Sequence, residues 1–121
     1  MTDHVVCDAA DLPPGNRVVT DLDGLDVGVF NVDGDLYAFP NWCPHQGGPL
    51  CEGPVGGTSA ETFDREDLTY DLQWVKEGEI LRCPWHQWEF DMTDNRFLHD
   101  PDRSLPSYQV RVEDDKVVLS R

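Results

Sequence analysis

Residues 43–51 read CPHQGGPLC, and this stretch decides how the rest of the chain is interpreted. Paired cysteines that hold a metal usually form a Cys-x-x-Cys motif, but here Cys43 is followed two positions later by His45. A second box, CPWHQWEF at residues 83–90, supplies Cys83 and His86. The full set is therefore Cys43-x-His45, then the 37 residues from 46 to 82, then Cys83-x-x-His86.

Two thiolates and two imidazoles suit one of two metal sites. One is a tetrahedral zinc, and the other is a [2Fe–2S] cluster in which two histidines replace two cysteines on one iron. Structural zinc sites usually draw a pair of cysteines and a pair of histidines from separate motifs, whereas each box here contributes one of each. This pattern favours the cluster, with a colourless structural zinc module as the alternative.

The two boxes resemble those of the Rieske iron–sulfur proteins, whose signature is C-x-H…C-x-x-H. The resemblance extends from the strands before Cys43 to the hairpin that closes the chain. It implies a Rieske-type antiparallel β sandwich with a cluster-binding subdomain made of two loops. It also implies that the metal-binding and cofactor-binding residues are Cys43, His45, Cys83 and His86, and that the cofactor is a [2Fe–2S] cluster.

In that family, small proteins pass single electrons from a flavin- or NAD(P)H-dependent reductase to a terminal oxygenase, with the histidine-bound iron near the surface. The resemblance therefore implies a soluble ferredoxin with no catalytic residues, one component of a multicomponent oxidoreductase rather than an enzyme by itself. The alternative is a small accessory subunit of a larger oxidoreductase, such as a NAD(P)H nitrite reductase.

Neutral histidines carry less negative charge than thiolates, so the potential of such a site lies in a window of roughly −150 to +300 mV. High-potential family members add a disulfide across the two loops and hydroxyl residues two and four positions after the second-box histidine. Here Trp85 stands between Pro84 and His86, and the two later positions are Trp88 and Phe90. We therefore predict a midpoint in the lower part of the window.

Residues beside the ligands are expected to shape the site. Gly47 and Gly48 let the backbone approach the sulfurs closely. Four aromatic residues are expected to pack around the cluster and keep water from its thiolates: Trp42, Trp85, Trp88 and Phe90. Cys7 and Cys51 are expected to be free thiols, with a disulfide between them left open as an alternative.

Short apolar runs separated by turn signals predict an all-β chain with no convincing helix. The Asp33-Gly34 pair predicts a two-residue hairpin turn. The expected strands are Arg17–Thr20, Asp26–Asn31, Asp35–Phe39, Tyr108–Val112 and Lys116–Leu119.

The segment between the boxes exceeds that of the usual ferredoxin by roughly twenty residues. Residues 52–67 are polar and Gly-rich, but Leu68, Tyr70, Leu72 and Trp74 then alternate with polar residues. With a turn at 76–79, this pattern predicts an extra hairpin that delivers Cys83 to its site. A disordered insertion is the alternative.

Composition places further limits on partners. The 121 residues suit a single domain, 1–121, and contain neither a membrane span nor a signal peptide, so the expected location is the cytoplasm. Twenty-four acidic against 9 basic residues give a net charge of −15, which repels nucleic acid and favours basic protein surfaces. Asp predominates among the acids, which indicates adaptation to high salt or an acidic protein from a GC-rich genome.

Overall fold

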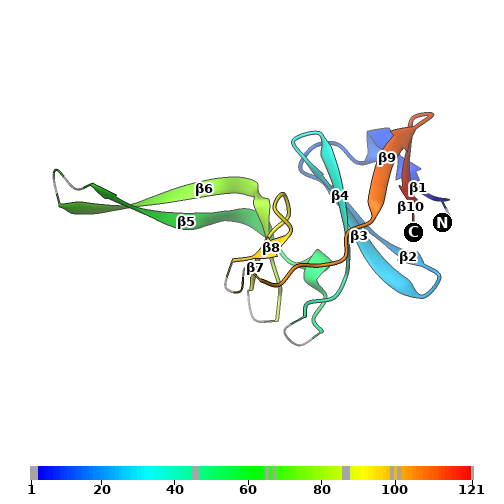
Figure 1. The fold of residues 1–121 in the computed structure, drawn as a ribbon. Helices are drawn as coiled ribbons and strands as arrows, with labels where there is room; N and C mark the ends of the chain where they lie inside the picture. The colour runs from blue at the N-terminus through cyan, green and yellow to red at the C-terminus, as the bar shows by residue number, and fades with distance from the viewer. Residues whose placement is uncertain are drawn as a thin grey trace.

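The computed structural model describes residues 3–44, 47–64, 66, 68–85, 88–98, 100 and 102–120, with the backbone alone at 60–64 and 69–72. Within these residues the chain forms ten strands and two short 3-10 helices, so the predicted all-β class is confirmed (Figure 1). The strands are β1 Asp3–Asp8, β2 Arg17–Leu22, β3 Leu25–Val32, β4 Asp35–Pro40, β5 Val55–Asp64, β6 Thr69–Arg82, β7 Glu89–Asp91, β8 Arg96–Phe97, β9 Gln109–Glu113 and β10 Lys116–Ser120. The 3-10 helices are η1 Ala9–Asp11 and η2 Leu50–Glu52. Among the described residues, no helix has the length and apolar character needed to cross a membrane.

The strands pair into three antiparallel sheets, ordered β1-β10-β9, β2-β3-β4 and β5-β6-β7-β8. The middle sheet is apolar on both faces because successive side chains of a strand point to opposite sides. Val27 and Val29 of β3 pack in one buried cluster with Leu119 of β10. Phe30 of the same strand packs in a second cluster with Phe90 of β7. The middle sheet therefore joins the terminal sheet to the sheet that carries the second box.

Two-residue turns close the hairpins of the first two sheets. The predicted turn at Asp33-Gly34 is confirmed, with φ angles of 52° and 97°. Asp23-Gly24 and Asp114-Asp115 adopt the same pattern, with φ of 55° and 92° and of 51° and 61°. Positive φ at both central positions matches the twist of the flanking strands, and this explains the preference for Asp and Gly there.

An extra hairpin lies between the boxes, as predicted, but its strands differ from the predicted ones: residues 68–74 and 80–82, expected as its two sides, fall almost entirely in the single strand β6, which pairs with β5 to form a long two-stranded arm. Figure 1 shows this inter-box arm projecting away from the other two sheets. Residues 55–64, for which the sequence predicted no strand, pair with β6 from Val55↔Leu81 to Asp64↔Thr69. This strand was missed because its sequence is polar and Gly-rich. A ribbon that projects from the protein buries few side chains, so it needs no alternating apolar pattern.

The predicted turn at 76–79 is wrong. Residues 76–79 belong to β6 and form a bulge, because the register runs from Gly56↔Ile80 to Thr58↔Val75, so that four residues of β6 oppose Gly57 alone. Lys76 and Gly78 take left-handed conformations, with φ of 57° and 86°, and absorb the extra length. The arm reverses between Asp64 and Thr69 instead.

Candidate metal centre

The two boxes lie in loops that begin with a buried cysteine. Cys43 starts the first loop, residues 43–48, three positions after the end of β4. Cys83 starts the second loop, residues 83–88, directly after β6, as predicted for a hairpin that delivers it. Each cysteine is 1% exposed, and both belong to the same buried apolar cluster, together with Phe39, Leu81 and Phe90.

The two loops are closed by the same hydrogen-bond pattern. The Cys43 N–H donates to the Gly48 carbonyl at 2.8 Å, and the Cys83 N–H donates to the Trp88 carbonyl at 3.0 Å. Each bond joins a cysteine to the residue five positions later. The Gly47 N–H also donates to the Cys43 carbonyl at 2.7 Å. Both cysteines are therefore held by the backbone at the same place in a closed turn.

Glycines bring the two loops into contact. A Cβ added at Gly48 would lie 3.1 Å from the Cys83 Sγ and 2.9 Å from the Trp85 ring, so the first loop approaches the thiol of the second, as predicted. Gly53, which sequence reasoning missed, packs more closely. A Cβ there would lie 1.6 Å from the carbonyl oxygen of Arg82, the residue before Cys83. The Arg82 N–H also donates to the Pro54 carbonyl at 3.0 Å.

These observations fit an iron–sulfur site. Thiolates are the iron ligands of [2Fe–2S] clusters, and apolar surroundings limit the access of solvent to them. The structure brings Cys43 and Cys83 into one group of buried apolar side chains, on two loops that are in contact, with glycine where the loops meet. The other two predicted ligands, His45 and His86, lie outside the described residues.

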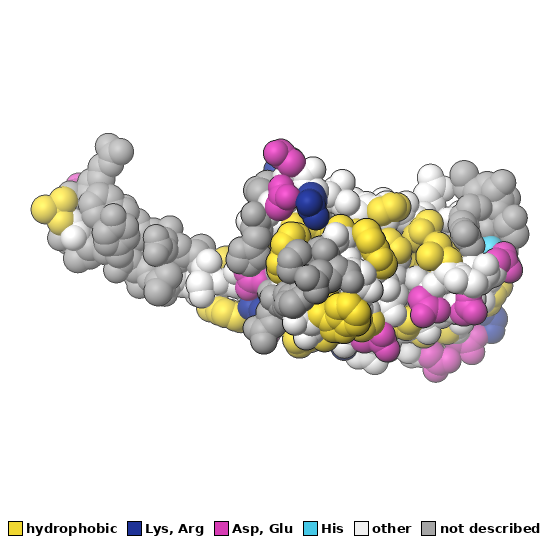
Figure 2. Space-filling model, turned by 90° about the horizontal axis from the view of Figure 1, so that it is seen from below, with side chains coloured by type: hydrophobic (Ala, Val, Ile, Leu, Met, Phe, Trp, Pro, Cys, Tyr) yellow, Lys and Arg dark blue, Asp and Glu magenta, His cyan; other side chains and the backbone are white. Residues whose placement is uncertain are grey.

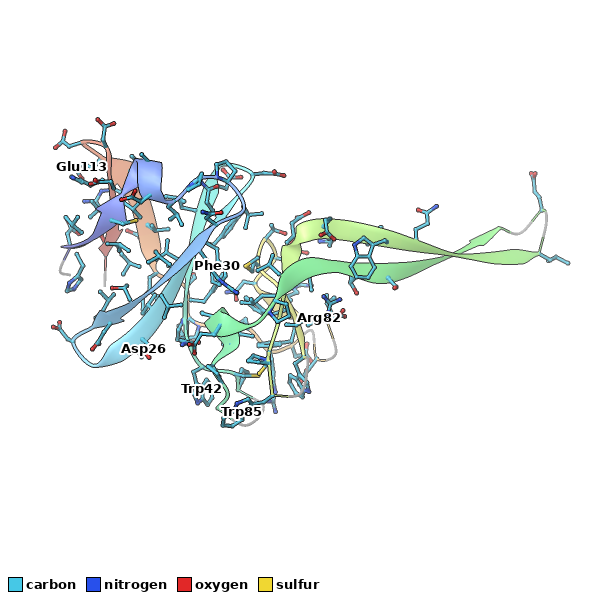
Figure 3. The ribbon with its side chains drawn as sticks, turned by 180° about the vertical axis from the view of Figure 1, so that it is seen from behind. Asp26, Phe30, Trp42, Arg82, Trp85 and Glu113 are labelled. Carbon is cyan, nitrogen blue, oxygen red and sulfur yellow. The ribbon has the colours of Figure 1, made fainter. Side chains whose placement is uncertain are left out.

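Of the four aromatic residues expected around the cluster, two are buried or partly buried and two are half exposed. Phe90 is fully buried, and Trp88 packs against the cluster that contains both cysteines. Trp42 and Trp85 are instead 50% and 56% exposed, so they are less buried than the other two aromatic residues. The Trp85 ring lies over the backbone of Gly48, at the surface of the loops rather than inside them. Figure 3 labels both indoles at the lower side of the molecule, between the terminal sheet and the arm.

The remaining cysteines have structural surroundings. Cys51 is fully buried, with its Sγ 3.6 Å and 3.5 Å from the carbonyl oxygens of Phe39 and Pro40. Burial raises the pKa of the Cys51 thiol to about 12, so it stays protonated. Cys7 packs against the other apolar cluster, and burial also raises the pKa of its thiol. Cys7 and Cys51 are not joined by a disulfide, in line with the expectation that both are free thiols.

The all-β fold and the two cysteine loops fit an iron–sulfur protein. The family model "Rieske [2Fe-2S] domain" matches residues 2–109, and the chain belongs to this family. The predicted family is confirmed, and membership implies a [2Fe–2S] cofactor.

Similar proteins include carriers and subunits. A ferredoxin component of naphthalene 1,2-dioxygenase/salicylate 5-hydroxylase systems from Ralstonia sp is 26% identical over 110 residues, covering 90% of this chain and 86% of that protein. The ferredoxin of carbazole 1,9a-dioxygenase from Nocardioides aromaticivorans IC177 has the same fold, with a TM-score of 0.68, 23% identity and coverage of 99% and 98%. A chain described as the small subunit of an NADH-dependent nitrite reductase from Mycobacterium tuberculosis has a TM-score of 0.71, 27% identity and coverage of 99% and 95%.

Proposed function

We propose that the chain is a one-electron carrier, a Rieske-type ferredoxin that passes electrons from a reductase to a terminal oxygenase. Its ligands are the four residues of the two boxes: Cys43 and Cys83 for one iron, His45 and His86 for the other. The observation that carries the proposal is the pair of buried cysteines on two interlocked, identically closed loops. Similarity to ferredoxin components of oxygenase systems supports the carrier role and an oxygenase as a partner.

The chain itself supplies burial, position and access. The bound cluster accepts and releases one electron. Apolar side chains of the cluster that includes Leu81 and Phe90 exclude water from the two thiolates. Trp42 and Trp85, which flank the loops, lie at one side of the molecule, between the terminal sheet and the arm, where a partner protein can approach them (Figure 3). In this proposal the chain is a single domain that transfers electrons and leaves the transformation of the substrate to its partner.

The docking face is the apolar surface around the two loops. Trp42 and Trp85 are large, half-exposed side chains, and Trp residues often anchor protein interfaces. In Figure 2, hydrophobic side chains gather in the middle of the face that carries the loops, whereas Asp and Glu gather mainly at the end opposite the arm. A partner with an apolar centre and a basic rim fits this distribution and the net charge of −15.

Electron paramagnetic resonance tests the proposed cofactor and ligands. The iron-replete protein is expected to be red-brown and to give a rhombic signal after dithionite reduction, with one electron taken up per chain. Serine variants of Cys43 and Cys83 are expected to lose the signal, whereas Cys7→Ser keeps it. A colourless protein, or a signal that survives the loss of both box cysteines, contradicts the proposal.

A second function is favoured by a specific observation. The chain resembles a nitrite reductase small subunit at 27% identity, which exceeds its identity to the carbazole dioxygenase ferredoxin. An accessory subunit would form a lasting complex with its large subunit, whereas a carrier exchanges partners quickly. Size-exclusion chromatography of the tagged chain, purified from its source at low and high salt, separates the two: a stoichiometric complex at both salt concentrations indicates the subunit.

A further inference from the structure

The base of the inter-box arm contacts the hairpin that carries the second loop. β6 and β7 pair through Ile80↔Asp91, Leu81↔Phe90 and Arg82↔Glu89, so residues 83–88 are the loop of a hairpin whose last cross-strand pair is Arg82–Glu89. Cys83 follows Arg82 directly, and Trp88, whose carbonyl closes the loop, precedes Glu89. The orientation of these two strand ends therefore sets the position of the Cys83 thiol.

Arg82 and Glu89 form a largely buried ion pair. The Arg82 Nη2 lies 2.8 Å from the Glu89 Oε1, and the two side chains are 22% and 18% exposed. Such a pair stabilises a fold only when the remaining donors and acceptors of both groups are also satisfied. The groups that satisfy them come from the arm.

Three residues of the arm complete the network. The Gly57 carbonyl accepts a hydrogen bond from the Arg82 Nη2 at 2.6 Å. The Thr58 hydroxyl donates to the Glu89 Oε2 at 3.0 Å, so both carboxylate oxygens are bound. The Arg82 guanidinium also lies over the Trp74 ring, 5.7 Å from its centroid. Figure 3 shows Arg82 where the arm meets the loops.

The bulge at residues 76–79 places the arm for this contact. A Cβ at Gly57 would lie 2.5 Å from the Val75 carbonyl and 2.7 Å from the Trp74 Nε1, so the strand crosses the indole only because this residue is glycine. The bulge is tied to β7 by Lys76, whose Nζ lies 2.6 Å from the Oδ2 of Asp91, a carboxylate that is 2% exposed. The arm therefore contacts β7 at two points on either side of Phe90.

We infer that the arm base, defined as Gly57, Thr58, Trp74 and Lys76, is a positioning device for the cluster. It holds the Arg82–Glu89 pair and thereby orients the loop that carries Cys83. The inference rests on the proposed ligand set and goes beyond it, because none of the four residues is a ligand. It gives the extra hairpin a role at the redox centre in addition to any contact with partners.

Two matched pairs of variants test the inference. Thr58→Val removes one hydrogen bond without changing charge or shape, and Thr20→Val is its control on β2, where the hydroxyl makes no hydrogen bond among the described residues. Arg82→Gln removes the cation of the network, and Arg111→Gln removes an ion pair with Asp3 on the distant terminal sheet. Each variant is measured for the rate of cluster loss to a chelator, for the EPR g-values of the reduced protein and for thermal unfolding.

Thr58→Val and Arg82→Gln are expected to lose the cluster roughly tenfold faster than the wild type and to shift the g-values, as outer residues around a metal site do. The two controls are expected to retain wild-type rates and spectra. The inference is overturned if Thr58→Val matches Thr20→Val in both the rate of cluster loss and the g-values. This holds even if Thr58→Val lowers the unfolding temperature. Should Arg82→Gln fail to fold, Thr58→Val decides. A wild-type protein without a cluster refutes the proposed function, whereas a wild-type cluster untouched by the variants refutes only the positioning role.

Discussion

Replacing Gly53 by alanine tests how tightly the chain that follows the first loop packs against Arg82, the residue directly before the second loop. A Cβ at this position would lie 1.6 Å from the Arg82 carbonyl oxygen and 3.1 Å from the Pro84 Cδ. Ordinary Cβ contacts begin near 3.4 Å, so the backbones must separate by about 1.8 Å. The obstructing atom belongs to the backbone, so no rotamer change relieves the clash.

The expected cost is large for a protein of this size. Overpacking costs about 1 to 3 kcal/mol, and breaking the bond from the Arg82 N–H to the Pro54 carbonyl adds about 1 to 3 kcal/mol when a buried group is left unpaired. Displacing residue 53 would also disturb the hydrogen bond that its carbonyl accepts from Arg17. We therefore expect Gly53→Ala to reduce the free energy of unfolding by about 2 to 6 kcal/mol, out of the 5 to 15 kcal/mol typical of a domain.

Urea denaturation of the iron-replete protein measures this loss, and the visible absorbance reports the cluster content in the same samples. Gly56→Ala is the matched control, because its Cβ would meet no backbone atom and only the ends of two side chains, the Arg82 Nη1 at 3.3 Å and the Trp74 Cζ2 at 4.0 Å. We expect the control to fold and bind the cluster normally, and Gly53→Ala to bind less cluster at any urea concentration. If Gly53→Ala is as stable and as fully loaded as Gly56→Ala, the loops are not joined as described.

Three further predictions concern the potential, pH and thiol reactivity. A redox titration is expected to give a midpoint in the lower part of the window of roughly −150 to +300 mV, because Trp88 and Phe90 offer no hydroxyl to the cluster, and a value above about +100 mV contradicts this. Burial by itself would raise the pKa of Asp91, but hydrogen bonds from Lys76, Thr93 and Asp94 together lower it. The ionised Asp91 therefore stabilises the fold above the ordinary pKa of about 3.9, and this stabilisation is lost as pH falls through the lowered value. Urea denaturation between pH 7 and pH 2 measures the free energy of unfolding. This free energy should fall less with acid in Lys76→Met than in the wild type. Iodoacetamide at pH 8 is expected to leave Cys51 unlabelled in the folded protein, because the thiol is buried and its pKa is about 12, and labelling before unfolding would refute this.

Local patterns in the sequence were sufficient for the strands of the middle sheet and for the closing hairpin of β9 and β10, but not for β5, β7 or β8. The Asp33-Gly34 turn follows from backbone preferences of two adjacent residues, which act before any tertiary contact forms. The same reasoning failed at residues 76–79, where Lys-Glu-Gly-Glu has the composition of a turn. The chain absorbs these residues as a bulge because Lys76 pairs with the buried Asp91, which lies 15 positions later.

Exposure was harder to predict than position. Trp42 and Trp85 lie beside the loops, as their places in the boxes indicate, yet their rings are half exposed. A tryptophan in the sequence signals only a large apolar side chain, and whether it lines a core or a docking face depends on what the rest of the fold places over it.

By itself, the sequence determined the family, the cofactor class and the candidate ligands, because ligand chemistry depends on residue type and short spacing: one cysteine and one histidine in each box. Only the tertiary structure decided how the boxes meet, through Gly53 against the Arg82 carbonyl, and how the arm reaches the second loop, through Thr58 and Glu89. These contacts join residues 29 and 31 positions apart, and their partners are selected by three-dimensional packing, which leaves no periodic signal in the chain.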